Sequence, residues 1–295
     1  MLHAVRKKPM RIKSSPGDIV FDVIKIAVLA LFVIIIVFPM LNVLSLSVSN
    51  GVYNANITFF PRGWTFASLK YVLTDSAFIR SFLNSLMLTV VVTLASNIFM
   101  SMAAYPLSKE DCPCKKGIMM FFVIVMLFSA GILPGYLLMR ALKLTNTIWS
   151  VVLVSITNVY NLLLFKTNFE GLPSEVEEAA RIDGASSIQL FFRIVVPLSL
   201  PIFASCIFFT IVGTWNSYGG AVMYIDSAHA KAQPLALYLY RLLTSTDSSM
   251  DSWMITNKSN VQAATILISL IPILLIYPYV IKYIKSGLTI GSVKG

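Results

Sequence analysis

The side chains that could do chemistry are concentrated in one segment, "LPSEVEEAARIDGASSIQLFFRIVVPLSLP", at residues 172–201. Only 12% of the chain is charged and 57% is hydrophobic, so a group of carboxylates and arginines between apolar runs needs an explanation. Carboxylates displayed together can form ion pairs with basic residues of a partner protein. The segment is therefore the first candidate for an interaction site.

The first half of this segment has the signals of a short helix. Ser174 and Glu177 have the spacing of a capping box, and Pro173 disfavours helix before them, so a helix is expected from about residue 175. Gly184 suits the left-handed position that ends a helix. A second helix is expected after Ser186 or Ser187. Its predicted core-facing residues are Ile188, Phe191, Phe192 and Val195, and Pro197 and Pro201 mark the return to the bilayer.

Two interpretations of this pair of short helices are open on the residues alone. At 100° per residue, small residues share one face of the first helix with Asp183, and Glu177, Glu178 and Arg181 share another. The small face could approach a partner protein closely and act as a docking element. The alternative is an ordinary amphipathic loop helix that lies on the lipid headgroups.

The rest of the chain offers few residues that could form a catalytic site. The two histidines, His3 and His229, cannot supply a histidine-based triad or a zinc-protease motif. The sequence contains no "GK" pair, so it lacks the phosphate-binding P-loop. Cys112 and Cys114 fit a polar turn, and Cys206 fits a small packing residue. We expect no metal site, no cofactor and no catalytic residue, and ATP with magnesium, if used, must bind to another subunit.

Polar and aromatic residues inside apolar runs are candidates for a solute path, because such groups usually face a cavity rather than lipid. The alternatives are interfacial anchoring for Trp and Tyr, and helix pairing for Asn. The candidates are Trp215, Asn216, Tyr218, Asn158, Asn161 and Asn84.

The elements that must position these residues are membrane helices. Six apolar stretches reach the roughly 20 residues needed to cross about 30 Å of hydrocarbon. They are residues 23–48, 80–104, 117–138, 147–167, 198–217 and 262–284. The fold class is therefore all-α, a polytopic membrane protein with six transmembrane helices. The expected organisation is a cytoplasmic N-terminus at 1–22, a transmembrane domain at 23–284 and a cytoplasmic tail at 285–295.

The net charge of +10 is explained by topology rather than by nucleic acid. If both termini are cytoplasmic, most of the 23 basic residues fall on the inside, including the cluster before the first span. The largest external segments are then 49–79 and 218–261, and the second, which includes the apolar run 235–243, is expected to hold one or two short helices.

The segment "EEAARIDGASSIQLFFRIVVP" closely resembles the EAA loop of importer-type ABC transporter permeases. "AAYPLSK", "FSAGILPGYLLMRALKLTNTIWSVVL", "WNSY" and "GLTIGSVKG" are similar to carbohydrate permeases related to the smaller maltose-importer subunit, in the branch that serves complex oligosaccharides. The residues that match the loop pattern are Glu178, Ala179, Ala180, Asp183, Gly184, Ala185, Ile194 and Pro197.

This resemblance implies a type I ABC importer permease fold in a bacterial plasma membrane, with the EAA coupling loop at 173–197. The loop would dock into a separate ATPase dimer, which binds ATP and magnesium, through Glu177, Glu178 and Asp183 for charge and Ala179, Ala180, Gly184 and Ala185 for fit. The tail residues Gly287, Thr289, Gly291 and Lys294 would reach towards the ATPase. The other implied partners are a second, non-identical permease, an extracellular solute-binding protein, and a sugar or oligosaccharide.

Other classes of transporter stay open at this point. An ABC permease for a non-sugar solute would share the coupling loop. An ion-coupled secondary carrier would need charged coupling groups at mid-membrane, and the apolar stretches contain almost no carboxylates.

Overall fold

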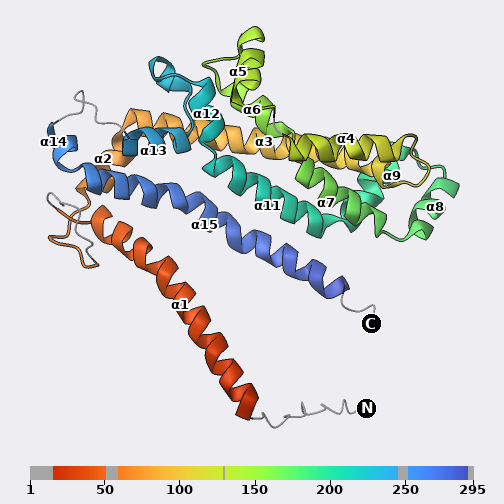
Figure 1. Cartoon of the computed structure of the whole chain (residues 1–295), viewed down its shortest axis with the longest axis horizontal. Helices are drawn as coiled ribbons and strands as arrows, with labels where there is room; N and C mark the ends of the chain where they lie inside the picture. The colour runs from red at the N-terminus through yellow and green to blue at the C-terminus, as the bar shows by residue number, and fades with distance from the viewer. Residues whose placement is uncertain (1–15, 51–58, 129, 245–251, 292–295) are drawn as a thin grey trace.

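The computed structural model describes residues 16–50, 59–128, 130–244 and 252–291, and the regular elements within these ranges are helices. Long apolar helices make up the body of the molecule, and short helices lie at its two ends and above its middle, where α5 and α12 project (Figure 1). In chain order the helices are α1 (Pro16–Ser47), α2 (Ala67–Thr74), α3 (Ser76–Ser108), α4 (Lys115–Leu127), α5 (Ile132–Ala141), α6 (Ile148–Ile156), α7 (Val159–Glu170), α8 (Ser174–Ile182), α9 (Ser187–Leu190), η1 (Phe191–Val195), α10 (Val196–Leu198), α11 (Leu200–Asn216), α12 (Gly219–Tyr224), η2 (Ser227–Ala232), α13 (Leu235–Thr244), α14 (Ser252–Thr256) and α15 (Lys258–Gly291).

Four helical segments of the described chain are long and apolar enough to cross a membrane: 17–47, 76–108, 148–170 and 258–282, the third of which consists of α6 and α7. Two further spans arise only if bent helix pairs are each counted as one. In one, α4 and α5 meet at 106°, and in the other the segments 187–198 and 200–216 meet at 83°. The predicted six spans are thus reached with two of them bent. The span expected at 117–138 corresponds to the bent pair α4 and α5, since the chain turns before α5, where Gly131 has φ +86°.

Helix α3 lies at the centre of the bundle and packs against α6, α7, α11 and α13. Its N-terminus is capped by the carboxylate of Asp75, which accepts hydrogen bonds from the backbone N–H groups of Ala77 and Phe78. Small polar residues recur every fourth position along its buried face, and such residues let neighbouring helix backbones approach closely. They are Ser81, Ser85, Thr89, Thr93, Asn97 and Ser101.

Separate groups of buried apolar residues hold the two ends of the bundle. At one end, Val72, Trp215 and Val261 join α2, α11 and α15. At the other end, Phe165 and Phe191 bring α7 and η1 together beneath α8. In Figure 1, α13 and α14 therefore lie at one end of the long axis and α8 at the opposite end. The molecule thus has two distinct ends joined by α3.

Helix α1 stands apart from the rest of the bundle for much of its length (Figure 1). It packs against α15, but none of the most apolar stretch of α1 is buried within this chain. An apolar surface of this length needs lipid or another protein to cover it.

Candidate functional site

The elbow between α8 and α9 is built around Gly184. Its φ is +80°, a left-handed conformation that glycine adopts without the steric cost of a Cβ. The N–H of Gly184 donates to the carbonyl of Arg181, and the N–H of Ala185 donates to the carbonyl of Ala180, each at 3.0 Å. These two bonds form a Schellman motif, which satisfies the last carbonyls of α8. The predicted helix end at Gly184 is confirmed.

The start of α8 differs from the prediction. Pro173 occupies the N-cap position, where no side chain makes a capping hydrogen bond, so the predicted Ser174 and Glu177 capping box is wrong. Glu177 instead reaches the end of α3. The capping box of this region lies one helix later, where Ser186 and the side chain of Gln189 bond reciprocally to each other's backbone N–H groups. This box explains why the chain becomes helical again directly after the elbow.

Helix α8 has one inward and one outward face. Glu177 and Ala180, three residues apart, are buried. Glu178, Ala179, Asp183 and Gly184 are exposed, and Ala185 is half-buried. The predicted coupling residues are therefore brought together on one short element, but Glu177 and Ala180 do not share the outward face with the others.

Two large apolar side chains flank the elbow on its exposed side: Ile182, which no motif in the sequence marked, and Ile188, which the helical periodicity predicted to face the core. Ile182 is 86% exposed and Ile188 is 69% exposed. Their position on either side of the left-handed Gly184 could have been noticed in "RIDGASSI". An exposed apolar pair beside charged residues is typical of a docking surface.

The second short helix buries a different set of residues from the one predicted. Leu190, Phe191 and Val195 are buried, whereas Ile188 and Phe192 are exposed. The predicted stripe assumed α-helical periodicity, but residues Phe191–Val195 form a π-helical turn, which rotates the face that later residues present. A break at Ser199 then separates α10 from α11.

Basic residues of the neighbouring helices α3, α4 and α7 lie beside α8. Lys109, the C-cap residue of α3, forms an ion pair with Glu177. Lys115 and Lys166 both pair with Glu170 at the end of α7, at 3.0 and 2.8 Å. A polar hollow of about 490 Å³ lies between these groups and α8. This end of the molecule therefore displays charge of both signs around a short, outward-facing helix.

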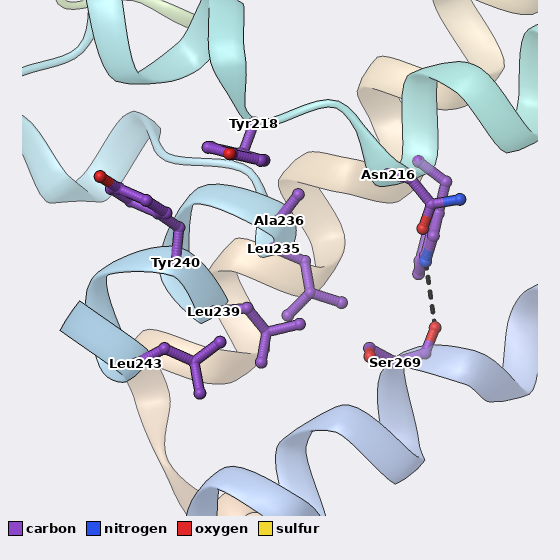
Figure 2. A pocket seen from close by; sticks show the side chains of 9 residues that line it. Asn216, Tyr218, Leu235, Ala236, Leu239, Tyr240, Leu243 and Ser269 are labelled. Atoms are coloured by element: carbon purple, nitrogen blue, oxygen red, sulfur yellow. Dashed lines mark hydrogen bonds between the residues drawn. The ribbon is translucent and has the colours of Figure 1, made fainter. Parts of the chain in front are cut away.

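The opposite end contains a cavity of about 350 Å³ between α11, α13 and α15 (Figure 2). Three predicted path residues, Trp215, Asn216 and Tyr218, line it. Figure 2 shows Tyr218 facing Tyr240 of α13, and their rings are stacked with centroids 4.8 Å apart and planes 15° apart. Both rings are partly exposed, so they form an aromatic wall at the cavity.

The remaining walls of the cavity are apolar or have their polar groups already paired. The Trp215 indole N–H donates to the carbonyl of Ser269 at 3.0 Å, the bond drawn in Figure 2. The Asn216 side-chain N–H donates to the carbonyl of Val212, one turn earlier. Tyr240 was missed in the sequence because its run, "LALYLYRLLT", reads as an apolar helix.

The other three predicted path residues do not line this cavity, and each has a structural hydrogen bond. Asn84 donates to the carbonyls of Lys231 and Gln233. Asn158 caps α7 by accepting from the N–H of Asn161. The amide of Asn161 is fully buried and donates to Thr210 of α11 at 2.9 Å. Their role in a solute path stays a prediction.

The predicted tail site falls at the limit of the described chain. Gly287, Thr289 and Gly291 lie in the last turns of α15, so the helix runs beyond the expected boundary at residue 284. Lys294 lies outside the described residues. The predicted contact of this tail with an ATPase stays a prediction.

Polar contacts brace the loops near the cavity. Asp226 and Asn146 bond to each other, with the Asn146 amide donating to the Asp226 carboxylate at 3.0 Å. The side-chain hydrogen bond with His229 is the main reason that the pKa of Asp226 lies below its usual value. Arg241 donates to Gln233 and to the carbonyl of Ile225, and burial lowers its pKa. These bonds fix η2 and α13 against α12.

The chain is similar over nearly its whole length to bacterial transport proteins. It is 36% identical over 283 residues to the protein LplC of Bacillus subtilis, covering 94% of this chain and 95% of LplC. It is 32% identical to the polygalacturonan/rhamnogalacturonan transport system permease protein YtcP of the same organism, covering 93% of this chain and 98% of YtcP. The chain belongs to the sugar ABC transporter permeases.

The solved structures agree with this membership. The permease fold superimposes with a TM-score of 0.84 on a chain of a bacterial ABC transporter involved in the import of the acidic polysaccharide alginate. That match has 27% sequence identity and covers 92% of this chain and 99% of the other. No protein-family model matches the chain. The all-α membrane fold predicted from the sequence is thereby confirmed, with the number of spans as described above.

Proposed function

We propose that this permease carries a complex oligosaccharide across a bacterial plasma membrane, driven by ATP that a separate ATPase dimer hydrolyses. The observation that carries the proposal is the outward-facing elbow of α8 and α9, with Glu178, Asp183 and Ile182 exposed around Gly184. Its carboxylates suit basic residues of a docking cleft, and the exposed isoleucine suits an apolar one. Ala179 and Gly184 allow close approach.

The cavity at the other end supports a sugar as the solute. The stacked rings of Tyr218 and Tyr240 offer an aromatic face, and the Asn216 amide supplies a polar group beside it. Aromatic faces with a few polar groups suit a pyranose ring, which has apolar C–H faces and hydroxyl edges. The similarity to YtcP, a polygalacturonan/rhamnogalacturonan transport system permease protein, favours a complex oligosaccharide over a monosaccharide.

The proposal requires partners. A second, non-identical permease would cover α1 and complete the path, and an extracellular solute-binding protein would deliver the oligosaccharide to the end that contains α13. Both termini would then be cytoplasmic, on the side of α8. The chain itself would bind no cofactor and would hydrolyse nothing.

Copurification tests this assembly. The chain should be expressed with the permease, ATPase and binding protein encoded beside its gene, and each subset should be purified from membranes. We expect the ATPase to copurify with the two permeases, and ATP hydrolysis to require the ATPase. ATP hydrolysis by the chain purified without partners would overturn the proposal, as would failure of every neighbouring ATPase to bind the permease pair.

A further inference from the structure

The carboxylate of Glu177 is turned away from the outward face of α8 and towards the end of α3. Both of its oxygens bond to the ammonium of Lys109, and the hydroxyl of Tyr105 donates to Oε2 at 3.4 Å. The Lys109 ammonium also lies 4.7 Å from the centre of the Tyr105 ring. The side chains of Lys109 and Glu177 are only 22% and 11% exposed. A sheltered cluster of three side chains therefore joins α8 to α3.

Besides this cluster, Arg181 of α8 also interacts with Tyr105 of α3, and the helix has few further features that could fix its orientation. It has nine residues and no side-chain cap at its N-terminus, and so short a helix is marginal without tertiary contacts. Its buried apolar contact is the small side chain of Ala180. Ala180 and Glu177 lie three residues apart on the same face, so the methyl group seats the helix and the ion pair sets its rotation.

The partner helix, α3, is held at its other end by polar contacts with the cavity region. Ser85 accepts a hydrogen bond of 2.7 Å from the N–H of Leu235, the first residue of α13. Asn84 donates to the carbonyls of Lys231 and Gln233, just before α13. The same helix therefore has polar contacts with the elbow at one end and with the cavity wall at the other.

We propose that Glu177 is a positioning residue, which holds α8 in a fixed orientation on α3 through Lys109, and does not contact the ATPase. The ion pair makes α8 and the end of α3 move together. This inference rests on the proposed function, since it assigns Glu177 a role within the same coupling element. It separates Glu177 from its neighbour Glu178, which faces outward and is left for docking.

Distances between two spin labels in the assembled transporter test whether the Glu177–Lys109 ion pair holds α8 in place on α3. Labels at Ile98→Cys on α3 and Glu175→Cys on α8 would be introduced after Cys112, Cys114 and Cys206 are replaced, in the nucleotide-free complex in lipid nanodiscs. Glu177→Gln and Lys109→Met remove the pair, and the double exchange Glu177→Lys with Lys109→Glu restores it with reversed polarity. Glu170→Gln is the matched control, because it breaks ion pairs with Lys115 and Lys166 at the same end of the bundle and leaves the Glu177–Lys109 pair in place.

We expect one narrow distance in the parent and the control. Each single variant should raise the population with displaced α8 about threefold, the effect of a partly sheltered ion pair, and the double exchange should restore the parent distribution. A merely structural loss would not be rescued by reversed charges. The inference would be overturned if both single variants kept the parent distance distribution. It would also be overturned if the double exchange displaced α8 as much as either single variant does. These distances do not depend on ATP-driven uptake. Normal ATPase binding by variants of the elbow would refute the proposed function, but it would not affect the inference that Glu177 holds α8 on α3.

Discussion

The phenol of Tyr238 donates a hydrogen bond of 2.9 Å to the carboxylate of Asp75, the same carboxylate that caps α3. This bond ties the cavity helix α13 to the start of the central helix. Burial, followed by the nearby charge of Asp75, raises the pKa of Tyr238 above its ordinary value. The hydroxyl is therefore held in its protonated, donating form.

Tyr238→Phe should destabilise the purified protein by about 1 to 2 kcal/mol at neutral pH, because a hydrogen bond to a charged group is lost. Thermal unfolding in detergent measures this change, with Tyr279→Phe as the control, since that ring is 74% exposed. The folded protein holds the Tyr238 proton more tightly than the unfolded chain. The contribution should therefore be fully present below the unfolded pKa of about 10 and fade as the pH rises through the folded pKa. Equal melting temperatures for Tyr238→Phe and the parent at neutral pH would contradict this account.

Loss of the aromatic wall should weaken uptake more than loss of a hydroxyl. Tyr240→Ala removes the partner of Tyr218, and an aromatic contact of this kind is commonly worth about 1 kcal/mol, or roughly a fivefold change in half-saturation. Tyr240→Phe keeps the ring and should stay near the parent value. The concentration of loaded binding protein that gives half-maximal uptake is the measurement. If Tyr240→Ala had the same half-saturating concentration as the parent, this cavity would not be part of the solute path.

The elbow should tolerate asparagine better than a β-branched residue at position 184. Steric clash does not restrict which residue fits at position 184, because a Cβ there would meet no atom within 4 Å. The cost is conformational, about 1 kcal/mol for a left-handed backbone and more for valine. Gly184→Val should therefore insert normally but retain less ATPase on copurification, whereas Gly184→Asn should retain more. Gly117→Val is the control, since its surroundings are also open and its φ is not positive. Equal retention by the Val and Asn variants would show that the left-handed turn is dispensable.

The exposed isoleucine of the elbow should contribute more to ATPase binding than either exposed carboxylate. Full burial of such a side chain is worth about 2 kcal/mol, whereas a partly exposed ion pair is worth about 1 kcal/mol or less. Ile182→Ser should thus lower ATPase retention more than Glu178→Ala or Asp183→Ala. Phe60→Ser, at an 85% exposed site in the expected external segment, serves as the control. The reverse order of effects would indicate that charge dominates docking.

Local signals predicted the elbow well, and long-range contacts could not be predicted. Gly184 follows a short helix and can adopt the left-handed backbone that commonly ends helices, so its turn was readable from neighbouring residues. Glu177 was assigned to a local cap because its partner, Lys109, lies 68 positions away. In the same way, "LALYLYRLLT" predicted the helix α13, but only folding brings Tyr240 onto Tyr218. The π-helical turn after α9 left no periodic signal, which is why the buried side of that helix was misassigned.

Uptake by the reconstituted transporter tests the central claim most directly. Both permeases and the ATPase dimer would be placed in proteoliposomes, with the neighbouring binding protein and a panel of oligosaccharides that includes galacturonan fragments on the outside. The account predicts accumulation of an oligosaccharide that requires enclosed ATP and the binding protein and is unaffected by ionophores. Accumulation that proceeds without ATP and follows an imposed proton or sodium gradient would contradict it.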